Sequence, residues 1–287
     1  GPLMDKTIRS GANDGDSGTL LSLSAQSNIT GRYIASENFY GVAQLGLRGG
    51  KHAGEYDDET VYANKDFDDV YLRLAYGVWD FGNGKLLVGK DYTPATFLGY
   101  SNMSGDTGLG GDAIMLTGGL PYISRVPQIK LSFGDFDIAL VEQRLNADDY
   151  GFGDVDFNVP RIEAAHVFRL NDDNLRIRPI AGFQTYDVED NATGASESID
   201  SYVLGVGVSA DFGPAYVKGT ISYQQNPGNY GDYNLANIAF RSAVIDSSGS
   251  VNDSDVMNGT LVGGFEMNDM VTFEGGAPDK SRYRRFS

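Results

Sequence analysis

The chain has 287 residues but no cysteine, only two histidines and a single tryptophan. Without cysteine it forms neither a disulfide framework nor a thiolate metal site. His52 and His166 leave little for imidazole chemistry. No stretch reaches the roughly 18 to 20 consecutive apolar residues of a membrane-spanning helix. That last absence does not exclude membrane crossing by β-strands, because only alternate residues of such a strand face lipid.

Basic residues are also scarce, since 22 Lys and Arg stand against 39 Asp and Glu, which gives a net charge of −17. Such a surface repels nucleic-acid phosphates, so we expect no nucleic-acid partner. We expect no cofactor either, apart from Ca²⁺ or Mg²⁺ at three acidic stretches, residues 13–18, 56–59 and 148–149. The first stretch lacks the twelfth-position glutamate of a calcium loop. Solvated acidic loops are the competing explanation for all three stretches.

Glycine, tyrosine and phenylalanine are abundant, with 38, 17 and 15 copies. Glycine disfavours helices, and aromatic side chains suit the pleated surface of a sheet. Apolar and polar residues alternate over about a dozen runs of about ten residues, the length of a tilted strand that crosses a bilayer. The sequence therefore predicts an all-β fold, namely a transmembrane antiparallel β-barrel of about 12–16 strands.

Two segments show the alternation most clearly. In residues 69–79 the pattern predicts one face with Val70, Leu72, Leu74, Tyr76 and Val78, and an opposite face that includes Arg73 and Trp79. Residues 128–141 repeat the alternation on both sides of Gly134-Asp135, which predicts a β-hairpin.

The connections between the alternating runs differ in length. Residues 81–84, 134–135, 171–174 and 211–214 form tight ones, whereas residues 51–68, 147–160, 187–200 and 225–233 form long acidic ones. One short end and one long-looped end are typical of outer-membrane barrels. We predict a single barrel domain over residues 18–287, preceded by a tag remnant and N-terminal segment over residues 1–17.

Two motifs carry a family resemblance. Residues 69–94 resemble the third and fourth strands of homotrimeric outer-membrane porins. Residues 126–133, Val-Pro-Gln-Ile-Lys-Leu-Ser-Phe, resemble a second signature of those general-diffusion porins and of the related dicarboxylate-type trimeric porins. The resemblance implies a water-filled channel for passive diffusion of small polar solutes and ions. It also implies a homotrimer embedded in the lipid of a Gram-negative outer membrane.

The resemblance further implies that residues 95–125 leave the wall and narrow the pore. Barrels of this family end with a strand whose last residue is aromatic, whereas this chain ends Arg-Phe-Ser. It is also shorter than the family leads one to expect. We therefore expect either that closing strands are missing or that the barrel is smaller than the resemblance implies.

Strand residues that face away from lipid are mostly basic, and rings of basic side chains favour anions in pores. We predict a constriction that prefers small anions such as carboxylates. Its basic side comprises Arg73, Arg125, Lys130, Arg176 and Arg178, and its loop side comprises Asp106 and Asp112. The alternative is that these basic groups only pair with acids across strands.

Other functions remain open at this point. The chain shows no Gly-x-Ser-x-Gly elbow, phosphate loop or paired-histidine metal motif, so we expect a protein that is not an enzyme. An outer-membrane β-barrel hydrolase and a soluble, secreted, acidic β-sandwich that binds carbohydrate are the two alternatives. His166 lies on the apolar side of its strand, and Gly205 and Gly207 suit packing between protomers.

Overall fold

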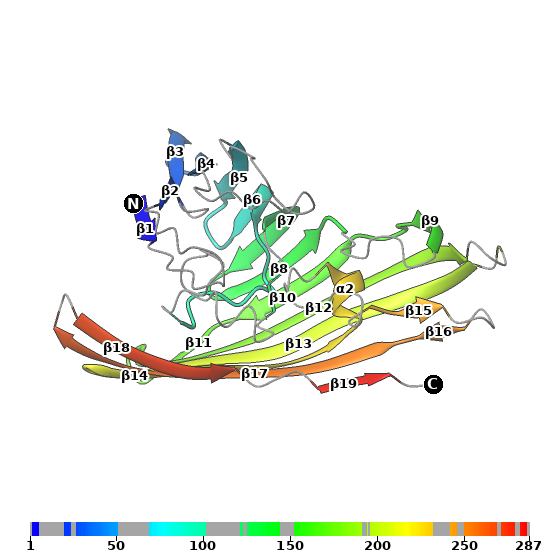
Figure 1. The fold of residues 1–287 in the computed structure, drawn as a ribbon. Coiled ribbons are helices and arrows are strands. Elements are labelled where there is room, and N and C mark those ends of the chain that lie inside the picture. Colours follow the sequence, from blue (N-terminus) through cyan, green and yellow to red (C-terminus); the bar gives the residue numbers. More distant parts are fainter. Residues whose placement is uncertain are drawn as a thin grey trace.

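A curved antiparallel sheet forms the wall of the molecule (Figure 1). The computed structural model describes residues 2–5, 20–23, 27–50, 69–101, 121–122, 125–143, 152–190, 194, 196–231, 242–245, 250–268, 271–278 and 282–285. Wall strands that follow one another in the chain pair with each other, so the topology is a meander. The wall strands are, in this order, β3 (Asn28–Ser36), β4 (Phe39–Gly50), β5 (Asp69–Asp80), β6 (Lys85–Tyr92), β7 (Arg125–Phe133), β8 (Phe136–Val141), β10 (Arg161–His166), β12 (Leu175–Asp190), β13 (Ser196–Phe212), β14 (Ala215–Gln225), β17 (Ser254–Asn268) and β18 (Val271–Pro278).

Shorter elements border this wall. They are β1 (Pro2–Asp5) and β2 (Leu20–Leu23), β9 (Phe152–Asp156), β11 (Phe168–Leu170), the pair β15 (Val244–Ile245) and β16 (Val251–Asn252), β19 (Arg282–Arg285), and the helix α2 (Pro227–Tyr230). β11 continues β10 along β12, and β19 pairs with the start of β17. In the described part of the chain, no helix is long and apolar enough to cross a membrane.

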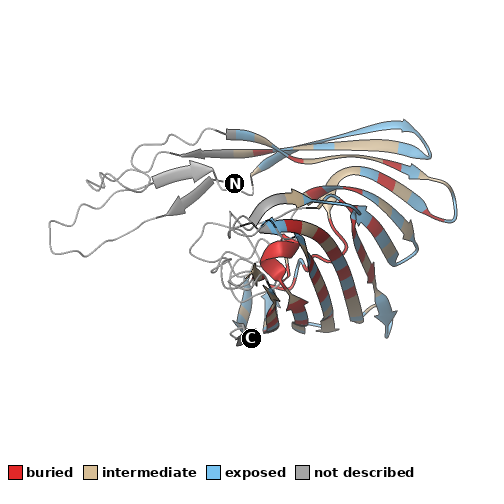
Figure 2. Ribbon diagram, turned by 90° about the vertical axis from the view of Figure 1, so that its right-hand side faces the viewer, coloured by how far each residue is buried: buried red, intermediate tan, exposed pale blue. Residues whose placement is uncertain are grey.

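Alternation along the strands separates two faces of the wall. In the β7–β8 hairpin, Ile129, Leu131 and Ile138 are exposed on the outside, whereas Gln128 and Ala139 are buried on the inside. Gly134 has the positive φ of 60° that this tight turn requires. Figure 2 shows the same banding on the longer strands, and α2 lies within the curve of the sheet. The predicted hairpin and its two faces are confirmed.

Strand β5 departs from the predicted alternation. In its ladder with β4 the strand has one residue more than its partner, because Arg73 forms a β-bulge. The bulge shifts the phase of the strand by one residue. Leu72 before it is exposed, but Val78 is only 3% exposed and Trp79 is 50% exposed. The prediction that Val78 shares a face with Leu72, opposite Trp79, is therefore wrong.

The connections sort by length as predicted, with one correction. Residues 81–84, 134–135, 171–174 and 213–214 make short turns at one end of the strands. The connection predicted over residues 187–200 is much shorter, because β12 and β13 stay paired as far as Glu189 and Ser196. The connection predicted over residues 51–68 lies outside the described residues, and so do residues 147–151 of the one predicted over residues 147–160, whose remainder contains β9.

The two outer strands of the wall are not joined to each other. No ladder among the described strands connects β3 with β18, so the barrel is open along this line. With β10 and β11 counted as one interrupted strand, the described wall has 12 strands, within the predicted range.

Candidate pore constriction

A segment of the chain leaves the wall after β6 and lies against its inner face. We call residues 93–101 the first inner segment. The Ala95 amide donates to Glu163 Oε2 on β10 at 2.8 Å, and the Ser101 hydroxyl donates to Glu274 Oε1 on β18 at 2.8 Å. This short stretch therefore spans the inner face from β10 to β18. The prediction that the chain leaves the wall after residue 94 is confirmed for these residues.

Basic side chains of the wall hold the backbone of the first inner segment. Arg178 on β12 donates from Nη1 to the Thr96 carbonyl oxygen at 2.6 Å and from Nη2 to the Pro94 carbonyl oxygen at 2.9 Å. Lys218 on β14 donates from Nζ to the Gly99 carbonyl oxygen at 3.0 Å. Carbonyl oxygens are neutral acceptors, and the carboxylates of Asp137 and Glu163 add an electrostatic attraction to Arg178.

Two glycines of β13 make room for the aromatic residues of the first inner segment. A Cβ atom on Gly207 would lie 1.9 Å from the Tyr100 hydroxyl oxygen, and one on Gly205 would lie 3.0 Å from the Phe97 ring. Phe97 and Tyr100 pack edge to face, with ring centroids 5.4 Å apart, and both are buried. In this chain Gly205 and Gly207 thus face inward and seat the segment, and the prediction that they pack protomers together is wrong.

A cavity of about 290 Å³ lies between the first inner segment and the wall. Lys130 of β7 and Arg178 line it together with Asp91, Asp137 and Tyr92. The Lys130 ammonium is 3.2 Å from Asp91 Oδ2, so this basic group is paired. Two of the predicted basic residues therefore come together at a polar cavity, one paired with a carboxylate and the other bonded to carbonyl oxygens.

The other predicted residues lie elsewhere. Arg73 is buried on the inner face, where Nε donates to Gln44 Oε1 at 2.9 Å. The Arg125 guanidinium lies over the Tyr92 ring, 5.4 Å from its centroid. Asp106 and Asp112 lie outside the described residues. The ion selectivity assigned to this set stays a prediction.

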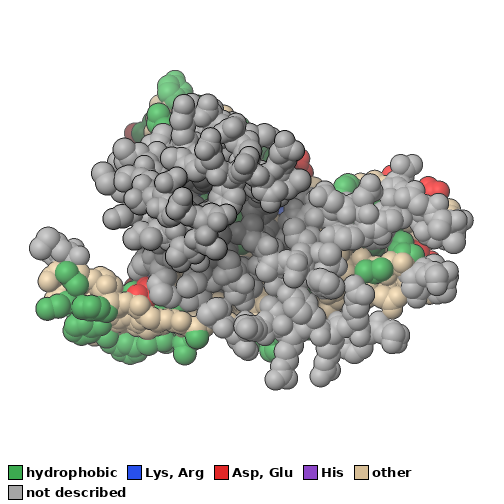
Figure 3. All heavy atoms as spheres, in the orientation of Figure 1, with side chains coloured by type: hydrophobic (Ala, Val, Ile, Leu, Met, Phe, Trp, Pro, Cys, Tyr) green, Lys and Arg blue, Asp and Glu red, His purple; other side chains and the backbone are tan. Residues whose placement is uncertain are grey.

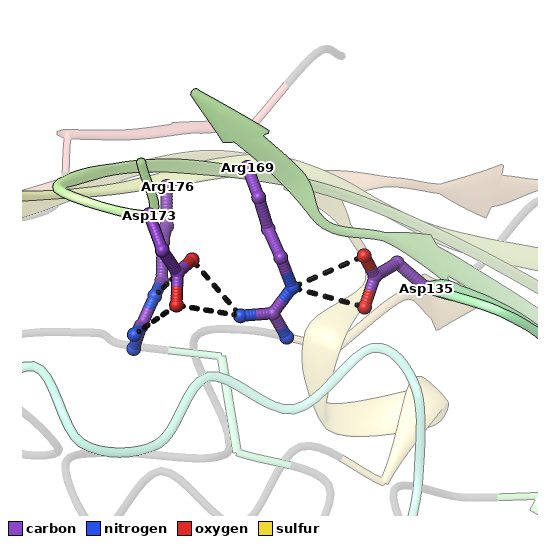
Figure 4. A network of polar contacts seen from close by, with 4 residues as sticks. All are labelled: Asp135, Arg169, Asp173 and Arg176. Carbon is purple, nitrogen blue, oxygen red and sulfur yellow. Dashed lines mark hydrogen bonds and ion pairs between the residues drawn. The ribbon is translucent and has the colours of Figure 1, made fainter. Parts of the chain in front are cut away.

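Arg176 belongs to a network at the short-turn end of the wall (Figure 4). Asp173 accepts from Arg176 Nη2 at 2.6 Å and from Arg169 Nη1 at 3.0 Å, and Arg169 Nε also donates to Asp135 at 3.1 Å. The hydrogen bond from Arg176, followed by that from Arg169, lowers the pKa of Asp173 to about 2. Arg176 thus pairs with an acid at the rim, as the alternative interpretation of the basic residues expected.

A second part of the chain also folds inward. We call residues 226–231, which include α2, the second inner segment, and all six are buried. Gln184 on β12 donates to the Asn229 carbonyl oxygen at 2.6 Å, and the Asn229 amide donates to the Tyr186 hydroxyl at 2.7 Å. Sequence reasoning missed this segment, because it predicted only a long acidic connection over residues 225–233.

Within the described ranges, no three His, Asp or Glu side chains gather as a metal site requires. The acidic stretches at residues 13–18, 56–59 and 148–149 lie outside those ranges. His166 lies among aromatic rings of the outer face, 4.4 Å from the Phe168 centroid and 6.3 Å from that of Phe136. Its predicted place on the apolar side of the strand is confirmed.

Comparison with solved structures identifies the class of fold. No protein-family model matches the chain, and no curated protein sequence matches it. The crystal structure of the outer membrane channel DcaP of Acinetobacter baumannii matches with a TM-score of 0.63 at 11% identity, over 96% of this chain and 75% of that one. This chain has the fold of an outer-membrane β-barrel.

A second solved structure is more distant. OmpT, an outer membrane protein of Vibrio cholerae, matches with a TM-score of 0.48 at 12% identity, over 96% of this chain and 73% of that one. That likeness is too weak to support an argument. The outer-membrane β-barrel fold predicted from the alternation is confirmed, and it places the first inner segment inside the barrel.

Proposed function

We propose that this chain forms a water-filled channel in the outer membrane of a Gram-negative bacterium, through which small polar solutes diffuse passively. The observation that carries the proposal is the first inner segment, which spans the inside of the barrel and leaves a polar cavity beside Lys130 and Arg178. Constrictions built from charged side chains select solutes without any catalytic step. On this proposal the protein is not an enzyme.

The outer face supports the membrane location. Hydrophobic side chains gather on the outside of the wall at β14, β17 and β18 (Figure 3). Among them, Ile221, Leu261 and Phe273 are exposed by more than half. In a soluble β-sandwich the apolar faces would form a dry core, so this arrangement contradicts that alternative. On this proposal lipid covers most of this surface, and the neighbouring protomers of a homotrimer cover the rest.

The position of Arg178 at the cavity supports a preference for small anions such as carboxylates. Asp91 offsets Lys130, whereas Arg178 donates hydrogen bonds to neutral carbonyl oxygens of the first inner segment. Its positive charge, which Asp137 and Glu163 offset in part, acts in a site bounded by low-dielectric walls, and such walls strengthen the attraction of an anion. Asp137 lines the same cavity, and it limits the preference to a moderate one.

Conductance of single channels tests this function. The purified protein, added to a planar bilayer under a salt gradient, is expected to open in steps grouped in threes, with a reversal potential that reports anion preference. A folded sample that never conducts would overturn the channel. In that case hydrolysis of ester, peptide and glycoside substrates by the same sample would test the alternative of an outer-membrane hydrolase.

A charge reversal at the cavity tests the selectivity. Lys130→Glu is expected to shift the reversal potential toward cations, because it replaces a positive charge beside the cavity with a negative one. Arg176→Glu serves as the matched control, since that residue lies at the short-turn rim. Equal shifts in both variants would contradict the assignment of selectivity to the cavity.

A further inference from the structure

Both inner segments meet at one carboxylate, Glu163 of β10. Its Oε2 atom accepts from the Ala95 amide of the first inner segment at 2.8 Å. Its Oε1 atom accepts from the Tyr230 hydroxyl of the second inner segment at 3.1 Å. The Glu163 side chain is completely buried, so water does not compete for either oxygen. Each oxygen of a single side chain therefore holds a different segment.

Arg161 completes the junction from the same strand. Its Nε atom lies 3.0 Å from Glu163 Oε1, and its Nη1 atom donates to the Tyr230 carbonyl oxygen at 2.6 Å. The guanidinium also lies 4.8 Å from the centroid of the Tyr230 ring. Tyr230 is thus held at its carbonyl, its ring and its hydroxyl, and the carboxylate cannot move without disturbing it.

Gly182 of β12 is what lets Tyr230 reach the carboxylate. A Cβ atom at this position would lie 1.9 Å from the Tyr230 hydroxyl oxygen and 3.1 Å from a methyl group of Val203. The ladder places Gly182 directly opposite Glu163. A single small residue therefore opens the path for the hydrogen bond that links the second inner segment to the junction.

We propose that Glu163 is a positioning residue that couples the two inner segments, so that loosening either one loosens the other. Because the carboxylate is fixed by both segments and by Arg161, losing one contact lets it rotate away from the second. The consequence for pore width rests on the proposed channel function, whereas the coupling itself is a property of the folded wall. The inner width of the channel is then set jointly by residues 93–101 and 226–231.

Thiol labelling measures this coupling directly, because the chain has no cysteine of its own. Thr96→Cys places a thiol at a buried position of the first inner segment, which reacts with a polar maleimide only when the segment lifts from the wall. Leu98→Cys, at an exposed position of the same segment, reports whether the reagent reaches the inside equally in every variant.

Tyr230→Phe removes one hydroxyl from the second inner segment and changes no residue of the first. We expect it to accelerate labelling of Thr96→Cys about tenfold or more, the effect of one hydrogen bond to a charged group. In a Glu163→Gln background, Tyr230→Phe is expected to add no further acceleration. Tyr223→Phe, which removes a hydroxyl bonded to Asp255 on the outer face, is the matched control and leaves labelling unchanged.

Faster labelling with Glu163→Gln but unchanged labelling with Tyr230→Phe would overturn the coupling, because Glu163 would then hold the first inner segment alone. If Glu163→Gln does not fold, Gly182→Ala replaces it, since the added methyl group displaces the Tyr230 hydroxyl. Gly182→Ala is expected to accelerate labelling as Tyr230→Phe does, and unchanged labelling again overturns the proposal. Coupled labelling in a protein that never conducts would instead reject the channel and keep the coupling.

Discussion

Strands β3 and β13 alternate in the same way along the sequence, yet they differ in burial. Every residue of β3 is exposed, whereas β13 buries Ser201, Val203 and Gly207 on its inner face. Part of the difference comes from pairing, because the described β3 pairs only with β4 whereas β13 pairs with both β12 and β14. The rest comes from what lies inside the curve of the sheet. The first inner segment packs against β13, but no described segment packs against β3. Alternation thus assigns residues to a face, and only contacts from elsewhere decide whether that face is buried.

We call the strands against which the inner segments pack the covered region, and strand β3 the bare region. Basic residues in the two regions also differ in burial. In the covered region Arg161 is completely buried against Glu163 and Tyr230. In the bare region Arg32 of β3 is exposed and lies over the Tyr40 ring at 4.1 Å from its centroid. A buried charge depends on its partners far more than an exposed one does. Matched substitutions in the two regions therefore measure what the inner segments contribute.

The largest expected effect is the loss of the buried cation. Arg161→Met leaves Glu163 buried without its counter-charge, and removing one partner of such a pair costs about 3–5 kcal/mol. Arg32→Met in the bare region loses an exposed cation–π contact of about 0.5–1 kcal/mol. Urea unfolding of the two variants in lipid vesicles gives both values. Similar losses in both would show that the inner segments do not alter the energetics of the wall.

The next effect concerns Gly207, against which the aromatic residues of the first inner segment pack. Gly207→Val puts a side chain where the Tyr100 hydroxyl and the Phe97 ring lie, and overpacking of this kind costs about 1–3 kcal/mol. It also forces both aromatic residues toward the inside of the barrel, so conductance through the proposed channel is expected to fall.

Gly31→Val on β3 is the control from the bare region, because the nearest atom to its added Cβ is 3.9 Å away. We expect unchanged conductance in that variant. Unchanged stability and conductance in Gly207→Val would show that the first inner segment does not rest on Gly207.

The smallest effect concerns the ion pairs of Asp173 at the short-turn end of the wall. The pKa of Asp173 is lowered from 3.8 to about 2, so its stabilising contribution is complete above its unfolded pKa and is lost as pH falls through about 2. Asp173→Asn is expected to lower the melting temperature slightly at pH 5, and the difference from the original protein disappears near pH 2.

Asp172→Asn is the matched control for that experiment. Asp172 is exposed in the same turn and also has a left-handed backbone, with φ of 51° against 70° for Asp173. It has no ion pair among the described residues. Asparagine tolerates this conformation, so neither variant strains the turn. Equal shifts of melting temperature in both variants would contradict a specific role for the Asp173 network.

Much of the wall could be predicted from the sequence. The β7–β8 hairpin, the tight turns and the outward position of His166 follow from alternation and turn residues, both of which act over a few neighbouring positions. The bulge at Arg73 escaped prediction because an additional residue in a ladder depends on the partner strand. Of the basic residues predicted for the constriction, Lys130 and Arg178 line the cavity whereas Arg176 lies at the short-turn rim. Residue type alone does not show how far along the barrel a basic side chain lies.

The sequence by itself determined the class of fold, the two faces of most strands and the place where the chain leaves the wall. Only the tertiary structure decided that Arg178 binds loop carbonyls, that Arg176 binds a turn, and that Gly205 and Gly207 seat two aromatic rings. It also decided that Glu163 joins two segments separated by more than a hundred residues. Alternation is a local property of the backbone, whereas these contacts depend on how the sheet curves and what it encloses.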